Sequence, residues 1–176
     1  MGNSEVGHNA LGCGQIYSQG AKLVNESILS GKIYQSESWK EIVENVKTNN
    51  STLHFLGLLS DGNVHSNISH LIAMLKEAKA EGVNKVRIHI LLDGRDVPPD
   101  SAINFVADVE KETAKIGVGK IATVVGRYYY MDRDKRWDRV EKGYNTVFNG
   151  VGTRYSTAEA GISASYKDKV LDEFIE

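Results

Sequence analysis

Apolar runs alternate with helical patterns over most of the chain, and this alternation predicts a parallel α/β fold. Residues 52–59, 86–92 and 121–125 are apolar runs of strand length, and each precedes a segment with apolar residues at helical spacing. The strands begin thirty-odd residues apart, which is the length of a βαβ unit, and right-handed crossovers make such strands parallel. We therefore predict a three-layer α/β/α sandwich with a mainly parallel sheet.

The helices that follow these strands have recognisable start and stop signals. The helix after the second strand should begin near Pro99, with Asp100 or Ser101 as its N-cap. Glycine follows the helical patterns of the first and third units, at Gly82 and Gly150, as is common at helix C-termini. The helix that follows the second strand is expected to bury Ile103, Val106, Val109 and Ile116. The third carries Trp137, Val140, Tyr144, Val147 and Phe148, and a short last helix is expected around residues 157–167.

The segment before the first strand has a different character. Residues 1–14 hold four glycines and no sustained apolar period, so we expect a loop there. A helix is predicted from about residue 20 to residue 29, with Gly31 at its end. A second helix should begin at Ser38, which forms a capping box with Glu41. Its buried stripe is expected to be Trp39, Ile42, Val43 and Val46.

Composition and charge exclude several classes of protein. The formal charge of the 176 residues is only −2, with 21 basic and 23 acidic side chains, so no overall field attracts nucleic acid. No apolar run is long enough to span a bilayer, and the amino terminus lacks a signal peptide. Cys13 is the only cysteine, which agrees with a reducing compartment. We therefore expect a cytoplasmic protein that binds neither nucleic acid nor membrane.

Charged side chains follow each predicted strand, and they form the candidate site. The loops are residues 60–66, 93–96 and 126–136, which parallel strands would bring to one edge of the sheet, where ligands bind in open α/β folds. Arginine forks suit a phosphate or carboxylate, while a histidine and a carboxylate suit hydroxyl groups. The side chains expected to converge on a small anionic molecule are His65, Arg95, Asp96, Arg127 and Arg133.

Several charged side chains of these loops also have a structural interpretation. Arg133 lies in a run of mixed charge, which is more often a solvated surface. Asp61 and Asp93 each precede a glycine and are expected to form turns rather than to catalyse. A lone histidine such as His65 is most often structural, so its candidacy depends on its position at a strand end.

Four motifs, in this order along the chain, closely resemble those of the cofactor-independent (2,3-bisphosphoglycerate-independent) phosphoglycerate mutases. They are Gly-Asn-Ser-Glu-Val-Gly-His at 2–8, Leu-Leu-Ser-Asp-Gly with Val-His-Ser within 58–66, Asp-Gly-Arg-Asp at 93–96, and Gly-Arg-Tyr-Tyr with Met-Asp-Arg within 126–133. In that family a metal-dependent phosphatase domain, related to alkaline phosphatase, carries a transiently phosphorylated serine. An inserted transferase domain binds the glycerate.

The resemblance implies a division of this chain into three parts. Residues 1–19 correspond to the catalytic-serine loop of an incomplete phosphatase domain, and residues 20–50 to a helical linker. Residues 51–176 correspond to the transferase domain, truncated at its C-terminus. Members of the family continue well beyond both ends of this sequence. The missing phosphatase domain is therefore an implied partner.

The resemblance also implies an isomerase of glycolysis, which interconverts 3-phosphoglycerate and 2-phosphoglycerate through a phosphoserine intermediate. Ser4 would accept the phosphoryl group and bind manganese, as one ligand of the two Mn²⁺ ions whose other ligands this chain lacks. Asp96 would exchange the proton of the glycerate hydroxyl, and the remaining candidates would contact the phosphoglycerate. This chain alone is expected to be inactive. The alternative is a non-catalytic anion-binding α/β module.

Overall fold

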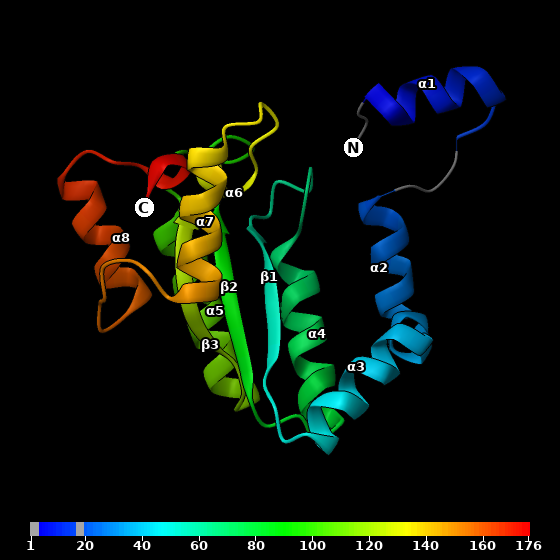
Figure 1. Cartoon of the computed structure of the whole chain (residues 1–176). Coiled ribbons are helices and arrows are strands. Elements are labelled where there is room, and N and C mark those ends of the chain that lie inside the picture. The colour runs from blue at the N-terminus through cyan, green and yellow to red at the C-terminus, as the bar shows by residue number, and fades with distance from the viewer. Residues whose placement is uncertain (1–3, 17–19) are drawn as a thin grey trace.

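A parallel sheet forms the centre of the molecule. The computed structural model describes the backbone of residues 4–16 and 20–176, and the side chains from residue 6 onwards within those ranges. The strands β1 (Leu53–Leu59), β2 (Val86–Leu92) and β3 (Lys120–Gly126) lie in that order, and both pairings are parallel. All three strands therefore end at the same edge of the sheet (Figure 1).

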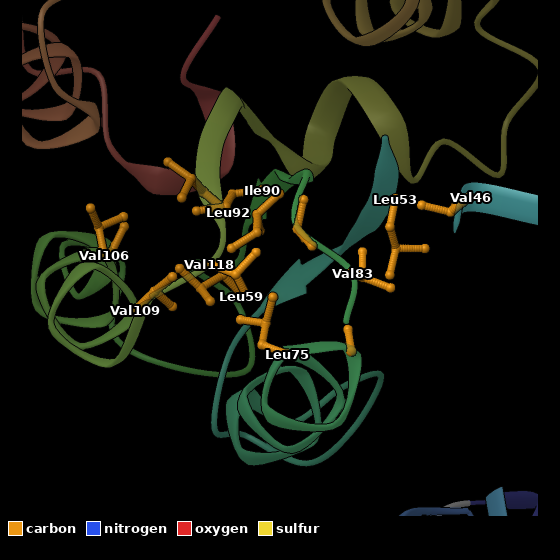
Figure 2. Packing of buried hydrophobic residues seen from close by; sticks show 14 of the residues in the cluster. Val46, Leu53, Leu59, Leu75, Val83, Ile90, Leu92, Val106, Val109 and Val118 are labelled. Carbon is orange, nitrogen blue, oxygen red and sulfur yellow. The ribbon is translucent and has the colours of Figure 1, made fainter. Parts of the chain in front are cut away.

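Helices cover both faces of the sheet, as the three-layer prediction requires. Helices α4 (Ile68–Ala80) and α5 (Ala102–Ile116) pack on one face and enclose the main core (Figure 2). On the other face, the short helix α6 (Arg127–Tyr130) covers a small cluster formed by Leu58, Leu91 and Val125. Helix α7 (Trp137–Asn149) lies in front of the sheet in Figure 1. The strands thus alternate side chains between two apolar layers.

Helix α5 has its N-cap at one of the two predicted residues, but a residue far away in the sequence accepts the hydrogen bond from its first turn. Ser101 occupies the N-cap position, but its side chain makes no capping hydrogen bond. The backbone N–H of Ala102 instead donates to Oδ2 of Asp172, at 2.9 Å. The hydroxyl of Tyr166 donates to the other oxygen of the same fully buried carboxylate. A buried non-local acceptor satisfies the helix end without a local cap.

The first described segment is a helix, so the loop prediction is wrong over Ser4–Cys13, while residues 1–3 lie outside the described residues. Helix α1 spans Ser4–Cys13. Gly7 and Gly12 lie inside it without positive φ, whereas Gly14, with φ of 63°, follows its end. Glycine within a helix costs about 1 kcal/mol relative to alanine, which weakens a helix but does not forbid one. No proline interrupts the segment. Its glycines alone were therefore not sufficient to prevent a helix.

Two further helices lead to the sheet. Helix α2 (Ala21–Leu29) confirms the helix expected there, and Gly31 after it has the predicted left-handed conformation, with φ of 72°. A 3₁₀ turn, Lys32–Gln35, then connects α2 to helix α3 (Glu37–Thr48).

Helix α3 begins earlier than predicted. Ser36, rather than Ser38, is its N-cap, and the Ser36 hydroxyl oxygen accepts a hydrogen bond from the backbone N–H of Trp39, at 3.2 Å. Two serines two residues apart both fit the capping pattern. The 3₁₀ turn ends directly before Ser36, which favours Ser36 as the N-cap. Trp39, Val43 and Val46 are buried as predicted, but Ile42 is half exposed, because it lies off the face that packs on the core.

The aromatic residues of α7 face away from the sheet. Trp137 and Phe148 are 70% and 63% exposed, respectively. The residue of α7 that is buried is Gly143. A Cβ atom on Gly143 would lie 2.8 Å from the Tyr130 ring, so glycine lets α7 approach α6 closely. The last helix, α8 (Ala158–Lys167), confirms the predicted one. Within residues 4–16 and 20–176 no helix is long and apolar enough to cross a membrane.

A chain of polar side chains crosses the middle of the sheet. The buried His89 accepts or donates at both ring nitrogens: its Nε2 lies 2.8 Å from Nδ1 of His54, and its Nδ1 lies 2.9 Å from the hydroxyl of Thr123. Burial, and then the neighbouring His54, lower the pKa of His89 below 6.5. The folded state therefore keeps this imidazole neutral where the unfolded chain takes up a proton.

We predict that the free energy of unfolding falls as the pH drops below about 6.5, because the unfolded state then binds more protons than the folded one. The loss should stop once the pH is below the lowered pKa of His89 in the folded state. Urea unfolding at several pH values checks this, with His89→Gln expected to flatten the dependence. Burial also lowers the pKa of His70, so His70→Gln should remove a separate part of the same pH dependence and is measured beside it. Equal slopes for wild type and His89→Gln would contradict the prediction.

Candidate functional site

The loops after the three strands meet at the carboxyl edge of the sheet (Figure 1). The first two loops touch: a Cβ atom on Gly62 would lie 3.0 Å from the backbone oxygen of Asp96. Ser66 ties the first loop back to its strand, because its hydroxyl donates to the backbone oxygen of Leu58, at 2.6 Å. These close contacts place the loop carrying His65 beside the loop carrying Asp96.

Arg127 joins the second and third loops through two carboxylates. Its Nη1 donates to Oδ1 of Asp93 at 2.6 Å and to Oδ2 of Asp96 at 2.8 Å. Arg127 and Asp93 are both buried. Oδ1 of Asp93 also accepts from the backbone N–H groups of Arg95 and Asp96, at 3.2 and 3.0 Å. Asp93 therefore forms the turn expected of it and, in addition, holds the arginine.

The charges of this network favour its ionised form. Burial alone would raise the pKa of Asp93, but the nearby Ser60 hydroxyl, the turn N–H groups and Arg127 together lower it. Burial likewise opposes the charge of Arg127, and the two carboxylates outweigh it and raise its pKa. Within the described residues, Oδ2 of Asp93 still accepts no hydrogen bond of good geometry. An ionised carboxylate with a spare buried oxygen depends strongly on its arginine.

His65 lies next to this network. Its Nε2 is 3.8 Å from Oδ2 of Asp96, and its side chain is half exposed. Part of the imidazole is therefore accessible to a ligand, while its Nε2 is within ion-pair distance of the carboxylate. Asp96 stands between His65 and Arg127, so three of the five predicted site residues are in direct contact or within ion-pair distance.

Arg95 and Arg133 do not join this cluster. Arg95 is 59% exposed, and its Nη1 lies 3.5 Å from Oε1 of Glu173. Arg133 is exposed in the connection between α6 and α7. The side chain of Ser4 lies outside the described residues. The predicted convergence of five side chains is thus present for His65, Asp96 and Arg127 but not for the two remaining arginines.

The connection that carries Arg133 is shaped by a carboxylate. Oδ2 of Asp132 accepts hydrogen bonds from the backbone N–H groups of Asp134 and Arg136, at 3.2 and 2.9 Å. The Asp132 side chain is almost fully buried, and its other oxygen lies 3.8 Å from Nη1 of Arg139. The loop from residue 132 to residue 136 therefore has a defined conformation, which presents Arg133 at its outer side.

The C-terminal segment 172–176 lies at the same edge, which sequence reasoning missed. The backbone N–H of Gly126 donates to the backbone oxygen of Ile175 at 2.7 Å, and Ile175 is buried in the main core. A Cβ atom on Gly126 would overlap the Glu173 carbonyl, and one on Gly94 would lie 3.0 Å from the Glu173 nitrogen. The glycines of the second and third loops thus make room for this segment. Its acidic composition was the only sequence signal available, and it does not specify a location.

The described residues offer no metal site. No three histidine, cysteine, aspartate or glutamate side chains among residues 6–16 and 20–176 are grouped so that they could hold an ion. The edge of the sheet is instead a site with paired arginines and carboxylates. Such a site can bind an anion and can exchange a proton with a hydroxyl group.

Comparisons with known proteins find relatives that match almost the whole chain. The sequence profile described as "BPG-independent PGAM N-terminus" matches residues 24–176. A 2,3-bisphosphoglycerate-independent phosphoglycerate mutase of Staphylococcus epidermidis is 48% identical over all 176 residues, and one of Clostridium botulinum is 50% identical over 175. The chain covers 35% and 34% of these two proteins, so it spans about a third of their length.

The fold of the chain is also similar to part of a solved phosphoglycerate mutase structure. In the crystal structures of Leishmania mexicana phosphoglycerate mutase at low cobalt concentration, a chain matches with a TM-score of 0.93 and 39% identity. The match covers 99% of the present chain and 33% of that one. The three-stranded parallel sheet and its flanking helices are therefore shared with part of a larger protein.

Proposed function

Because the chain belongs to the family of 2,3-bisphosphoglycerate-independent phosphoglycerate mutases, we propose that it is the substrate-binding part of such an enzyme. The reaction is the interconversion of 3-phosphoglycerate and 2-phosphoglycerate through a phosphoserine on Ser4. Residues 51–176 act as the transferase domain, residues 20–50 as a linker, and residues 1–19 as part of the phosphatase domain. The remaining two thirds of the family's length would supply the rest of that domain.

The observation that carries this proposal is the Asp93–Arg127–Asp96 network at the carboxyl edge of the sheet. A buried guanidinium that uses one nitrogen for both carboxylates has its other N–H groups available for a phosphate or carboxylate. Oδ2 of Asp96 lies between Arg127 and His65, where a hydroxyl of the glycerate could reach it. Binding the anion beside a proton acceptor is what a phosphate shift between two hydroxyls requires.

The individual roles follow from position and chemistry. Arg127 would bind the anion from the buried base of the site. The exposed Arg95 and Arg133 would contact the anion from the solvent side. Asp96 would take and return the proton of the glycerate hydroxyl, with His65 as a hydrogen-bond partner of that hydroxyl. Splitting the shift into two in-line transfers through Ser4 lets the glycerate be reoriented while these residues hold it.

Metal ions would be bound elsewhere in the full-length enzyme. Family resemblance implies two Mn²⁺ ions with Ser4 among their ligands, but no group of described side chains fits an ion. A serine hydroxyl needs a base or a metal to become a useful nucleophile. We therefore assign the activation of Ser4 to ligands outside the described residues.

The test is a chimera in which these residues replace the matching 48%-identical segment of the Staphylococcus epidermidis relative. We expect it to interconvert the two phosphoglycerates with manganese and to carry phosphate on Ser4, as detected by mass spectrometry. The Ser4→Ala chimera should lose both properties, and the isolated 176-residue chain should show no turnover. A folded chimera without label or activity would favour the non-catalytic anion-binding module instead. Sustained turnover by the isolated chain would contradict the assignment of the missing ligands.

A second expectation concerns Arg95 in the same chimera. If its guanidinium forms a charge-assisted hydrogen bond to the substrate, Arg95→Ala should lose about 1.5–3 kcal/mol of transition-state stabilisation, which is about tenfold or more in kcat/KM. Arg95→Lys should recover only part of this, because lysine lacks the planar fork. Steady-state kinetics in both directions measure the effect. Unchanged turnover of Arg95→Ala would show that this residue is structural.

A further inference from the structure

The C-terminal segment 172–176 is anchored firmly enough to place a charge at the site. Asp172 caps helix α5 at Ala102, and its backbone N–H donates to the backbone oxygen of Pro99, at 3.0 Å. Ile175 is buried in the main core and bonds to Gly126. Glu173 lies between these two anchors, so its backbone has little freedom to move away.

Glu173 directs its carboxylate at Arg95. The distance from Oε1 to Nη1 is 3.5 Å, and the Glu173 side chain is only 18% exposed, whereas Arg95 is 59% exposed. Among the described residues Arg95 is the one ion-pair partner of Glu173. The largely buried partner is thus the carboxylate, and the exposed partner is the arginine.

This pair explains why Arg95 stands apart from Arg127. Arg95 follows directly on the turn held by Asp93, and the next residue, Asp96, bonds to Arg127. The backbone of Arg95 therefore belongs to the site, while its guanidinium is held at the outer edge by Glu173. An anion that binds at Arg127 competes with Glu173 for this second guanidinium.

We propose that Glu173 is a positioning residue that holds Arg95 at the edge of the site and is replaced as its partner by the bound substrate anion. The inference rests on the proposed function. Breaking the Arg95–Glu173 pair opposes the gain from the new pair, so Glu173 lowers the affinity for every anion that recruits Arg95. The effect should weaken with added salt, because the pair is partly exposed.

The test is a double-mutant cycle on the 176-residue chain, with 3-phosphoglycerate titrated calorimetrically at low ionic strength and again at about 0.15 M salt. We expect Glu173→Gln to bind about two- to fivefold more tightly than wild type, the range of a partly exposed ion pair. Arg95→Ala and the double variant Arg95→Ala/Glu173→Gln should bind equally weakly, because the effect acts through Arg95.

A control in the same segment separates this effect from general charge. Glu176 accepts hydrogen bonds from the Tyr129 hydroxyl and from Lys142, both at 2.7 Å, and makes no contact with Arg95 among the described residues. Glu176→Gln should therefore leave the affinity for 3-phosphoglycerate within about twofold of wild type, since any effect on the site would be long-range and screened. The thermal midpoint of Glu173→Gln should match that of wild type.

The possible results are distinguishable. Equal or weaker binding by Glu173→Gln, with Arg95→Ala still weaker than wild type, would overturn the role of Glu173 and leave the proposed function standing. If Glu173→Gln also raises the affinity for 3-phosphoglycerate in the Arg95→Ala background, the role of Glu173 is likewise overturned. If neither wild type nor Glu173→Gln binds 3-phosphoglycerate, the proposed substrate site and this inference both fail.

Discussion

Replacing Arg127 with alanine is expected to destabilise the chain by about 3–5 kcal/mol, the usual loss when one partner of a buried ion pair is removed. Asp93 is fully buried and keeps its charge through Arg127, two backbone N–H groups and the Ser60 hydroxyl. Without the guanidinium, the pKa of Asp93 should rise, and the free energy of unfolding should fall. The same variant should lose binding of 3-phosphoglycerate, because it removes the buried anion-binding group.

Urea unfolding and calorimetric titration measure the two effects. Arg133→Ala is the matched control: it removes an exposed arginine from the neighbouring loop and should change stability by less than about 0.5 kcal/mol. The pair Asp93→Asn/Arg127→Met should recover part of the stability lost by Arg127→Ala, since the fully buried carboxylate at position 93 is then replaced by a neutral amide. Wild-type stability in Arg127→Ala would show that Asp93 does not depend on this arginine.

Replacing Asp172 with alanine is expected to cost about 2–4 kcal/mol of unfolding free energy, from two buried donors left without an acceptor and one lost helix cap. Ala102 N–H and the Tyr166 hydroxyl both donate to this fully buried carboxylate. Burial and this bond raise the pKa of the Tyr166 hydroxyl, which keeps it a donor at neutral pH. Loss of Asp172 should also loosen the segment that carries Glu173.

Chemical denaturation measures this loss, and limited proteolysis reports the loosening of the C-terminus. Asp100→Ala is the informative control, because Asp100 is the cap that local sequence suggests but is exposed in the structure. It should change stability by less than about 0.5 kcal/mol. An equal loss in both variants would mean that Asp172 acts through its charge near the helix rather than through its hydrogen bonds.

Local rules failed at the amino-terminal side for identifiable reasons. The loop expectation for residues 1–14 counted glycines, although glycine only weakens a helix and α1 contains two of them. The capping box at Ser38 was plausible, but Ser36 also fits an N-cap and lies where the preceding 3₁₀ turn ends. In both cases several conformations satisfied the local pattern, and small differences in free energy decided between them.

Local patterns succeeded where burial on both faces restricts the choice of residues. The sequence predicted β2 with its observed bounds, Val86–Leu92, because a strand covered by two layers is mostly apolar. It also predicted parallel pairing from the strand spacing, and hence that Arg127, Asp96 and His65 would lie at one edge. A strand end and its turn are encoded within a few neighbouring residues, and the strand direction follows from the length of the βαβ unit.

By itself, then, the sequence determined the layers, the direction of the strands and the types of side chain at their ends. The tertiary structure alone decided which of those side chains are paired, as in Arg127 with Asp93, and which distant group completes each contact. Asp172 caps a helix 70 residues away, and Glu173 meets Arg95 across 78 residues. Such contacts depend on how whole elements pack, because the partner of a buried charge is chosen by proximity in space and by desolvation. Neither is readable from neighbours in the chain.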